Sequence, residues 1–399
     1  MRKGLVLLAL VAMLALCATS FAAVPLPVVL ANDDNPNAGA NSATAFHLNT
    51  SDGTMASIKV LETGGTGLGY GFFAYTGSAI ASNGNCVFVI NTASDTISSF
   101  AAPSYAKTGD AGFTGMFSGE LSGGGVALSP NGKLLASANS GTLNVSTWAV
   151  GTKCTLTHIA DYTPLIGADT FVTLAFAPNG KALIVPAVDF QGVEIFQVNA
   201  NGTLTDGGSV SWANLTDCQT AGCYPTGLDI TTDSKVAVFG NASGSQNSVL
   251  SVNIGPKGLS NPQNWPITAC PSGCGNPNVP WFSQNGAKGN GELYVGMSGY
   301  SINSIPSGEV TMNFTESPLS ITEEGGGTLI PTPDEALGAI RSVGATGNGT
   351  GGGMLVYAIY PNQIQTATVD AGGAITLGPV TTDPNGQGLL SISVYPNTR

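Results

Sequence analysis

A short apolar–turn–apolar pattern recurs along the chain. Its clearest copies span Val126–Asn139 and Leu174–Ala187, where a Pro-Asn-Gly-Lys turn separates two apolar segments. Weaker copies begin at Ala79, Leu228 and Trp281, so the turns recur at the spacing of about 50 residues that is typical of stacked β-repeats. Asn-Gly supplies the positive φ angles that join antiparallel strands tightly. Each copy therefore predicts a β-hairpin.

Each hairpin is followed by an alternating segment and then by a Thr- and Val-rich segment. Four antiparallel strands cannot bury both faces of their sheet alone, so successive sheets must stack. Radial stacking at a period of roughly 40–50 residues produces a β-propeller. No segment has an amphipathic helical period. We therefore predict an all-β, seven-bladed propeller of four-stranded antiparallel blades, with blades 2 to 7 beginning near Ala79, Val126, Leu174, Leu228, Trp281 and Leu337.

The two ends of the chain are predicted to share blade 1. Residues 388–396 resemble an inner strand with its turn, and residues 24–63 hold the other apolar segments of a blade. Pairing of about 24–63 with 386–399 would close the ring and remove free sheet edges, which otherwise template aggregation. We expect residues 23–399 to form a single domain.

The N-terminus has the pattern of an export signal. Arg2 and Lys3 precede an apolar run over residues 4–16, and Ser20-Phe21-Ala22 follows as a small-x-small site. The run is too short to span a bilayer, so residues 1–22 are predicted to be a signal peptide and the protein to be secreted or periplasmic. A lipoprotein signal at Cys17 is the alternative, although Leu16 is not the small residue expected there. No membrane span is expected after residue 22.

The composition narrows the possible partners. The chain has 399 residues, with 12 basic and 24 acidic side chains and a net charge of -12. An acidic surface does not attract nucleic acid or anionic membranes. Only 2 residues are histidines, which restricts metal centres and acid–base catalysis that depend on imidazole. We expect no nucleic-acid partner.

The cysteines beyond residue 22 are even in number, which favours disulfides in an exported protein. Two close pairs lie in Gly- and Pro-containing connections: Cys218 with Cys223, and Cys270 with Cys274. Disulfides that staple these loops are predicted. A four-cysteine zinc site is the alternative, although the spacings differ from the usual zinc knuckles. Cys86 and Cys154 either pair or remain buried as small apolar side chains.

The turn over residues 129–133, Ser-Pro-Asn-Gly-Lys, followed by an apolar strand, resembles the lactonase-like, YVTN-type seven-bladed propellers. That superfamily includes bacterial 6-phosphogluconolactonase and a muconate cycloisomerase. The resemblance implies His, Arg and acidic groups at the loop-lined end of the central channel, where they polarise a lactone carbonyl and activate water. His47 and His158 instead fall in outer-strand patterns, which weakens that transfer of function.

Arg341 is the most unusual charge, because it aligns with the apolar position that precedes each blade turn. A buried Arg needs a partner, and Asp334 or Glu335 lies just upstream. Arg341 is therefore a candidate catalytic group that polarises a carbonyl, or else one partner of an inter-blade salt bridge. Comparable loops on other blades carry acids that are either solvated or form an acidic rim for a cation or polyol: Asp110, Glu120 and Asp169.

Two further segments, residues 32–35 and 347–352, resemble known ligand-binding motifs. Asn32-Asp33-Asp34-Asn35 is oxygen-rich and could hold Ca²⁺, although it lacks the spacing of a known loop and a simple turn is the alternative. Gly347–Gly352 matches a dinucleotide pattern but precedes a strand, whereas that motif must open a helix. No cofactor is expected.

Two functions remain open. The first is a secreted, monomeric binding or scaffold protein that contacts a glycan, an envelope component or a protein through its loops. The alternative is a lactonase-type hydrolase or isomerase at the channel mouth that uses Arg341 with neighbouring acids. The missing catalytic histidines favour the first, since a shared fold transfers function poorly.

Overall fold

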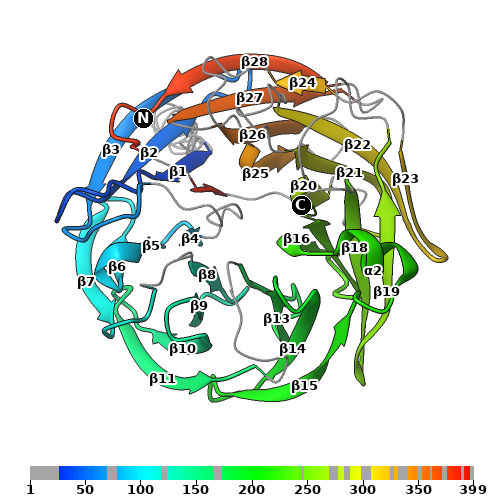
Figure 1. Cartoon of the computed structure of the whole chain (residues 1–399). Helices are drawn as coiled ribbons and strands as arrows, with labels where there is room; N and C mark the ends of the chain where they lie inside the picture. The colour runs from blue at the N-terminus through cyan, green and yellow to red at the C-terminus, as the bar shows by residue number, and fades with distance from the viewer. Residues whose placement is uncertain are drawn as a thin grey trace, which may run out of the picture.

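The computed structural model describes residues 27–69, 79–117, 124–164, 173–241, 243, 247–268, 277–282, 288–297, 307–323, 328–330, 340–347, 353–359, 362–370, 375–387 and 391–395. Their strands form seven antiparallel sheets arranged around a common axis (Figure 1). The predicted seven-bladed propeller is confirmed. Within these ranges, no helix is long and apolar enough to cross a membrane.

Blades 2 to 5 each consist of four consecutive strands. Blade 2 contains β4 (Ile80–Ser82), β5 (Cys86–Asn91), β6 (Thr96–Ala101) and β7 (Ala106–Gly112). Blade 3 contains β8 (Gly124–Leu128), β9 (Leu134–Asn139), β10 (Asn144–Val150) and β11 (Leu156–Tyr162). Blade 4 contains β12 (Ala175–Phe176), β13 (Ala182–Ala187), β14 (Gly192–Val198) and β15 (Leu204–Ser211). Blade 5 contains β16 (Pro225–Ile230), β17 (Val236–Asn241), β18 (Ser248–Gly255) and β19 (Gly258–Pro266).

Blades 6 and 7 complete the consecutive part of the ring. Blade 6 contains β20 (Pro277–Phe282), β21 (Asn290–Met297), β22 (Ser307–Glu316) and β23 (Leu319–Glu323). A short extra strand, β24 (Thr328–Ile330), pairs with the first residues of β22, which extend beyond the part that pairs with β23. Blade 7 contains β25 (Ile340–Gly347), β26 (Gly353–Ile359), β27 (Gln363–Val369) and β28 (Ile375–Thr382).

Both ends of the chain contribute to blade 1, as predicted. Its strand order is β29 (Ser391–Tyr395), β1 (Val28–Asn32), β2 (Ser42–Leu48) and β3 (Met55–Glu62). In the register, Leu30 lies between Ser393 of β29 and Ala45 of β2. The C-terminal strand is therefore the innermost strand of a sheet begun by the N-terminal segment, and it closes the ring.

The recurring hairpin turn has the expected geometry. In blade 3, Ser129 N–H donates to the Leu134 carbonyl at 2.8 Å, and Gly132 takes a φ of 67°. In blade 4, Gly180 takes a φ of 70° in the equivalent turn. Only a residue without a Cβ adopts this conformation at little cost, which explains the repeated Asn-Gly.

The hydrophobic core lies between neighbouring blades. Alternate residues of β1 face opposite sides of its sheet: Val29 packs into a cluster shared with blade 7, whereas Leu30 packs into one shared with blade 2. A strand buried on both faces reads as a continuous apolar run. That is why the second strand of each blade was recognisable in the sequence.

Two disulfides cross-link the described residues. Cys86 pairs with Cys154, whose Cα atoms lie 5.4 Å apart, and thereby joins blade 2 to blade 3. Cys218 pairs with Cys223, as predicted, with a Cα separation of 5.1 Å. The other predicted pair, Cys270 with Cys274, lies outside the described residues.

Candidate functional site

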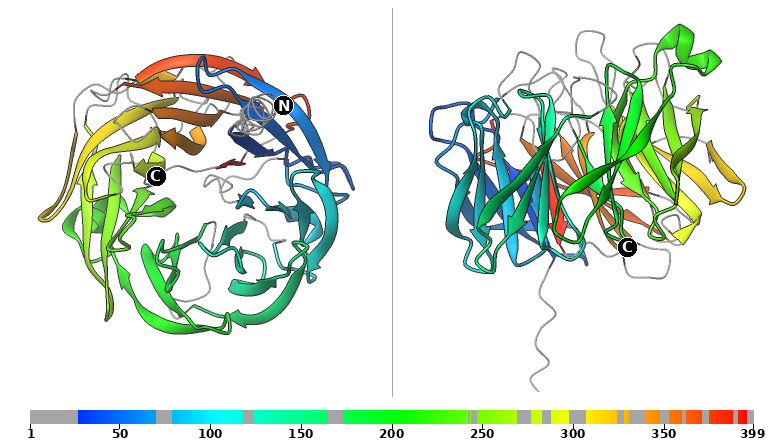
Figure 2. Two further views of the ribbon diagram at one scale, coloured as in Figure 1. Left: turned by 180° about the vertical axis from the view of Figure 1, so that it is seen from behind. Right: turned by 90° about the horizontal axis from the view of Figure 1, so that it is seen from below.

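We call one end of the ring the loop face. There the outer strand of each blade connects to the inner strand of the next, and the second strand of each blade turns into the third. The short helix α2 (Thr216–Ala221) projects from this end, and the C-terminus lies towards the other (Figure 2). Because loops from every blade converge here, this face is the place to look for a functional site.

A buried amide–hydroxyl pair recurs at the loop face. In blade 3, the Asn139 Nδ2 donates to Ser146 Oγ at 2.6 Å. The same bond joins Asn91 to Ser98 at 2.9 Å and Asn241 to Ser248 at 2.8 Å. This repeat was not predicted, although the constant spacing of seven residues between the Asn and the Ser is a usable signal in the sequence. These side chains satisfy one another in the interior, so they are structural.

An acid extends the pair on two blades. Ser146 Oγ donates to the Asp161 carboxylate at 2.5 Å, and His158 Nε2 lies 2.8 Å from the same carboxylate oxygen. In blade 2, Ser98 Oγ donates to Asp110 at 2.6 Å, and Lys107 Nζ lies 2.7 Å from that carboxylate. These acids sit on outer strands, are partly exposed and have basic neighbours. They anchor strands rather than face the channel.

Blade 4 reverses the arrangement. Glu194 of β14 occupies the position of the third-strand Ser, and Ser209 of β15 lies opposite it where blades 2 and 3 have Asp. Ala187 replaces the Asn, and Glu194 is fully buried. In blade 4 the carboxylate therefore lies on the third strand, whereas in blades 2 and 3 it lies on the outer strand.

The closing joint of the ring holds a buried pair of acids. Asp33 follows β1 and Asp383 follows β28, and both are 0% exposed. Thr44 Oγ1 lies 3.2 Å from Asp33 Oδ1 and 3.1 Å from Asp383 Oδ1. Ser42 Oγ donates to Asp33 in a short contact. Burial, followed by the adjacent Asp383 carboxylate, raises the pKa of Asp33 to about 8.

Asp34 is separate from that pair. Its carboxylate accepts a hydrogen bond from Leu68 N–H at 2.8 Å, and it anchors the loop that leads to blade 2. Burial raises the pKa of Asp34 to about 6, against the lowering effect of the backbone donors. Asp33 and Asp34, predicted together as Ca²⁺ ligands, therefore have different neighbours. The Asp33 carboxyl group lies beside that of Asp383, whereas the Asp34 carboxylate accepts a hydrogen bond from the backbone of Leu68.

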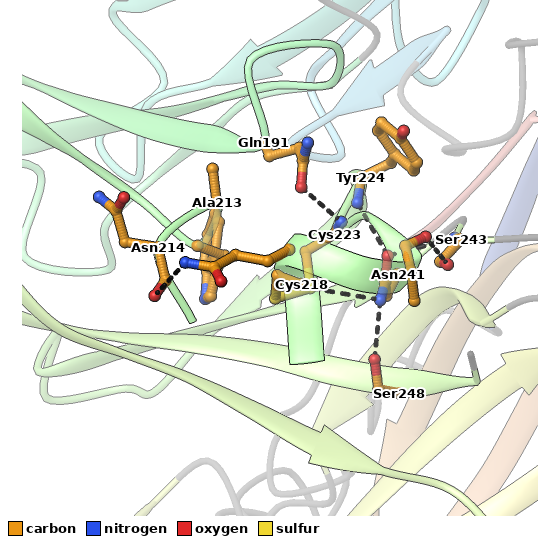
Figure 3. The surroundings of a disulfide bond; sticks show 12 residues. Gln191, Ala213, Asn214, Cys218, Cys223, Tyr224, Asn241, Ser243 and Ser248 are labelled. Atoms are coloured by element: carbon orange, nitrogen blue, oxygen red, sulfur yellow. Dashed lines mark hydrogen bonds between the residues drawn. A yellow bond between two sulfur atoms is a disulfide. The ribbon is translucent and has the colours of Figure 1, made fainter. Parts of the chain in front are cut away.

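The segment 212–224, which we call the α2 ledge, is a loop at this face that is held by a disulfide and by hydrogen bonds (Figure 3). The Cys218–Cys223 disulfide closes it, Cys223 N–H donates to Gln191 Oε1 at 2.8 Å, and Tyr224 N–H donates to Asn241 Oδ1 at 2.8 Å. Trp212 is fully buried beneath it. The ledge is therefore fixed to blades 4 and 5.

Phe190 lies in the turn beside the ledge. Its side chain is 49% exposed, the largest exposure among the large apolar side chains of the described residues. Ser211 Oγ donates to the neighbouring Gln191 carbonyl at 3.0 Å, and Trp212 N–H donates to the same oxygen at 2.9 Å. An exposed aromatic ring on a turn whose backbone is fixed by hydrogen bonds is a candidate contact for a ligand.

A cavity of about 320 Å³ lies at the opposite end of the ring, between blades 4 and 5. Ile195, Ile254 and Pro256 form its apolar lining, and Lys181 and Gln197 supply polar groups. No carboxylate lines it, so the cavity lacks an acid–base pair.

Comparison with solved structures identifies the architecture. A putative 6-phosphogluconolactonase from Bacteroides fragilis is 16% identical, with a TM-score of 0.68, covering 93% of this chain and 99% of that chain. The periplasmic gluconolactonase PpgL of Pseudomonas aeruginosa is 12% identical, with a TM-score of 0.64, covering 93% and 100%. This is the lactonase-like propeller fold. No family profile and no curated protein sequence matches the chain.

This lactonase-like propeller does not place its histidines at the channel. His47 lies on β2, the third strand of blade 1, and His158 lies on β11, the outer strand of blade 3. The His158 ring packs edge-on against Trp148, with ring centroids 4.9 Å apart. The predicted outer-strand position is therefore confirmed for His158 and wrong for His47, which lies one strand further in, although neither lies on an inner strand.

The structure describes only some of the residues that were predicted to be catalytic. Arg341 lies in the inner strand β25, where the pairing with β26 shifts register, and its side chain is outside the described set. Asp334, Glu335, Asp169 and Glu120 also lie outside the described residues. Asp110 was wrongly placed in a loop: it belongs to the outer strand β7, where it pairs with Ser98 of β6. Among the described residues, no three metal-ligating side chains cluster.

Proposed function

We propose that the protein is an exported binding protein that holds a neutral, polar ligand such as a glycan against its loop face. The observation that carries this proposal is Phe190, an exposed aromatic ring on a turn fixed to the disulfide-closed α2 ledge. Rigid aromatic side chains lose little conformational entropy on binding and contribute much of the affinity at such surfaces.

The charge of the protein supports a neutral ligand. The chain has twice as many acidic as basic side chains, so an anionic ligand would meet a repulsive field. Disulfides persist in oxidising compartments, which agrees with export directed by residues 1–22. Both histidines lie on third or outer strands, which favours binding over acid–base chemistry at the channel.

Substitution of the aromatic ring tests the proposal. We expect Phe190→Ala to weaken binding to a retained neutral polysaccharide, identified by screening the purified protein against a panel, by at least roughly tenfold. Val380→Ala is the matched control, because Val380 is 47% exposed but lies on the outer strand β28. Equal affinity of both variants and the wild type, or no binding to any neutral polysaccharide, would refute the glycan proposal.

Lactone hydrolysis is the second candidate, and it is supported by the similarity of fold to the Pseudomonas aeruginosa gluconolactonase. In this reading Arg341, on the inner strand β25, polarises the lactone carbonyl and a loop acid activates water. Hydrolysis of glucono-δ-lactone by the purified protein, lost in a folded Arg341→Ala variant, would favour this function over the first. Wild-type protein without activity would exclude it for that substrate.

A further inference from the structure

The buried acids at the ring closure have no positive partner. Asp33 and Asp383 are both fully buried, and none of the ion pairs formed by the described residues involves either of them. Two adjacent carboxylates in a dry interior cannot both carry their charge without a counterion. Either a proton or a cation must therefore lie between them.

The hydrogen atoms available are too few for the oxygen atoms present. Thr44 Oγ1 lies 3.2 and 3.4 Å from the two Asp33 oxygens and 3.1 Å from Asp383 Oδ1. A hydroxyl carries one hydrogen, so it can donate to only one of these three oxygens. When both carboxyl groups are ionised, the other two contacts are approaches between oxygen atoms without a hydrogen between them.

Asp383 has a second feature that favours a cation at this position. Its Oδ2 is buried and has no hydrogen-bond partner, although Asn385 N–H donates to Oδ1 at 3.0 Å. Asp383 lies 350 residues after Asp33 in the sequence. The two side chains are therefore brought together by ring closure and not by a local turn. A buried carboxylate oxygen without a donor, beside a second carboxylate, is a position that a positive charge would stabilise.

We propose that Asp33, Asp383, Ser42 and Thr44 form a Ca²⁺ site that joins blade 7 to blade 1. Two carboxylates neutralise a divalent ion, and the two hydroxyls add neutral oxygen ligands. Oxygen atoms bound to one Ca²⁺ at about 2.4 Å and at right angles lie about 3.4 Å apart, close to the separations around Thr44.

The donor set selects the class of metal. All the side chains around the site offer oxygen, and none offers sulfur or imidazole nitrogen, which disfavours zinc and copper. The Asn385 amide lies 3.3 Å from Thr44 Oγ1, and an amide rotated by 180° presents its oxygen instead of its nitrogen. A flexible set of oxygen ligands of this kind suits Ca²⁺ better than Mg²⁺, which demands a rigid octahedron.

A cation here would act on stability. Asp383 precedes β29 and Asp33 follows β1, the two strands whose pairing closes the ring. One ion would thus bind both termini of the propeller together. The site is distinct from the proposed ligand surface at Phe190, so its failure would leave the binding proposal untouched.

Calcium titration of the full chain tests the site. After treatment with EDTA and its removal, we expect calorimetry to report one Ca²⁺ bound per chain, and saturating Ca²⁺ to raise Tm by roughly 3–6 °C. Asp33→Asn and Asp383→Asn should each abolish both effects. Asp52→Asn is the matched control: this acid lies in the same blade but is exposed, and the variant should bind Ca²⁺ as the wild type does.

Two outcomes would overturn the proposal. One is wild-type protein that binds no Ca²⁺, which would show that the two acids share a proton instead. The other is Ca²⁺ binding that survives in both the Asp33 and the Asp383 variants, which would place the ion elsewhere. If the Asn variants do not fold, Thr44→Val replaces one hydroxyl by a methyl of the same shape, and it should weaken Ca²⁺ binding at least roughly tenfold.

Discussion

The joint between blades 2 and 3 and the joint between blades 7 and 1 hold the ring together by different means. The first combines an apolar cluster that includes Phe88 and Trp148 with the Cys86–Cys154 disulfide. The second has an apolar cluster as well, but it ends at the loop face in Asp33 and Asp383. The first joint is covalent, whereas the second is non-covalent and contains two adjacent buried carboxyl groups.

The difference lies in where the acids are placed. Asp110 and Asp161 sit on outer strands beside a basic residue, and water screens their charge. Asp33 and Asp383 are buried between two blades, and neither forms an ion pair with any basic residue that the structure describes. Hydrogen bonds from Ser to Asp on the outer strands therefore stabilise the blades without a further ion. At the joint between blades 7 and 1, the stability that such bonds provide depends on a proton or cation that neutralises the two carboxylates.

The largest expected effect is a dependence of stability on pH at the closure. In EDTA, the raised pKa of Asp33 means that the folded chain holds a proton which the unfolded chain releases near pH 4. The free energy of unfolding should therefore fall as pH rises from about 4 to 8, by at most about 1.4 kcal/mol per pH unit for this group. Urea unfolding across this range measures the slope.

Asp34 contributes with the same sign, but its contribution ends near pH 6, because burial raises its pKa only to about 6. The interval from pH 6.5 to 8 therefore isolates Asp33. Asp33→Asn should flatten the curve in that interval and leave the slope at lower pH in place. An unchanged slope above pH 6.5 would mean that Asp33 is not the titrating group.

The second effect concerns the covalent joint. Replacing Cys86 and Cys154 together by Ser should lower the free energy of unfolding by roughly 4 kcal/mol, because that bond closes a loop of 68 residues. The equivalent change at Cys218 and Cys223 should cost roughly 2 kcal/mol, since their separation is 5 residues. Chemical denaturation of both variants gives the comparison, and equal losses would contradict the loop-entropy argument.

The smallest effect belongs to the recurring amide. Asn139→Ala removes bonds to Ser146 and Asn144 in the interior and should cost about 1–3 kcal/mol. Asn199 offers a matched control, because its Nδ2 donates to Thr203 and Thr205 in the same way but at the exposed surface. Asn199→Ala should cost less than about 0.5 kcal/mol. Urea unfolding measures the loss of free energy of unfolding in each variant. Similar losses at Asn139 and Asn199 would show that burial does not determine how much these hydrogen bonds contribute to stability.

Much of the fold could be read from the pattern of residues. The Asn-Gly turns, the apolar second strands and the complementary ends predicted seven blades and their closure, because the period of the repeat and the glycine conformation are local properties. The starts of blades 2 to 6 fell within three or four residues of the observed strands, and β25 begins at Ile340 where Leu337 was predicted.

The candidate sites were less predictable. Asp33 was singled out with its neighbour Asp34, yet its partner is Asp383, which the sequence does not mark. Asp110 was assigned to a loop because glycines surround it, but strand pairing with Ser98 holds it in β7. The exposure of Phe190 had no sequence signal, since a lone aromatic after a strand is ordinarily buried.

By itself, the sequence determined the architecture, because turn chemistry and strand periodicity act over a few residues and repeat around the ring. Only the tertiary structure decided which charges meet. Ring closure brings Asp33 and Asp383 together, whereas Asp34 binds the backbone of the loop to blade 2. Packing of the α2 ledge against blades 4 and 5 places the exposed Phe190 beside a loop that a disulfide closes. Contacts between segments that are distant in the sequence depend on how the ring closes, and local sequence patterns do not predict them.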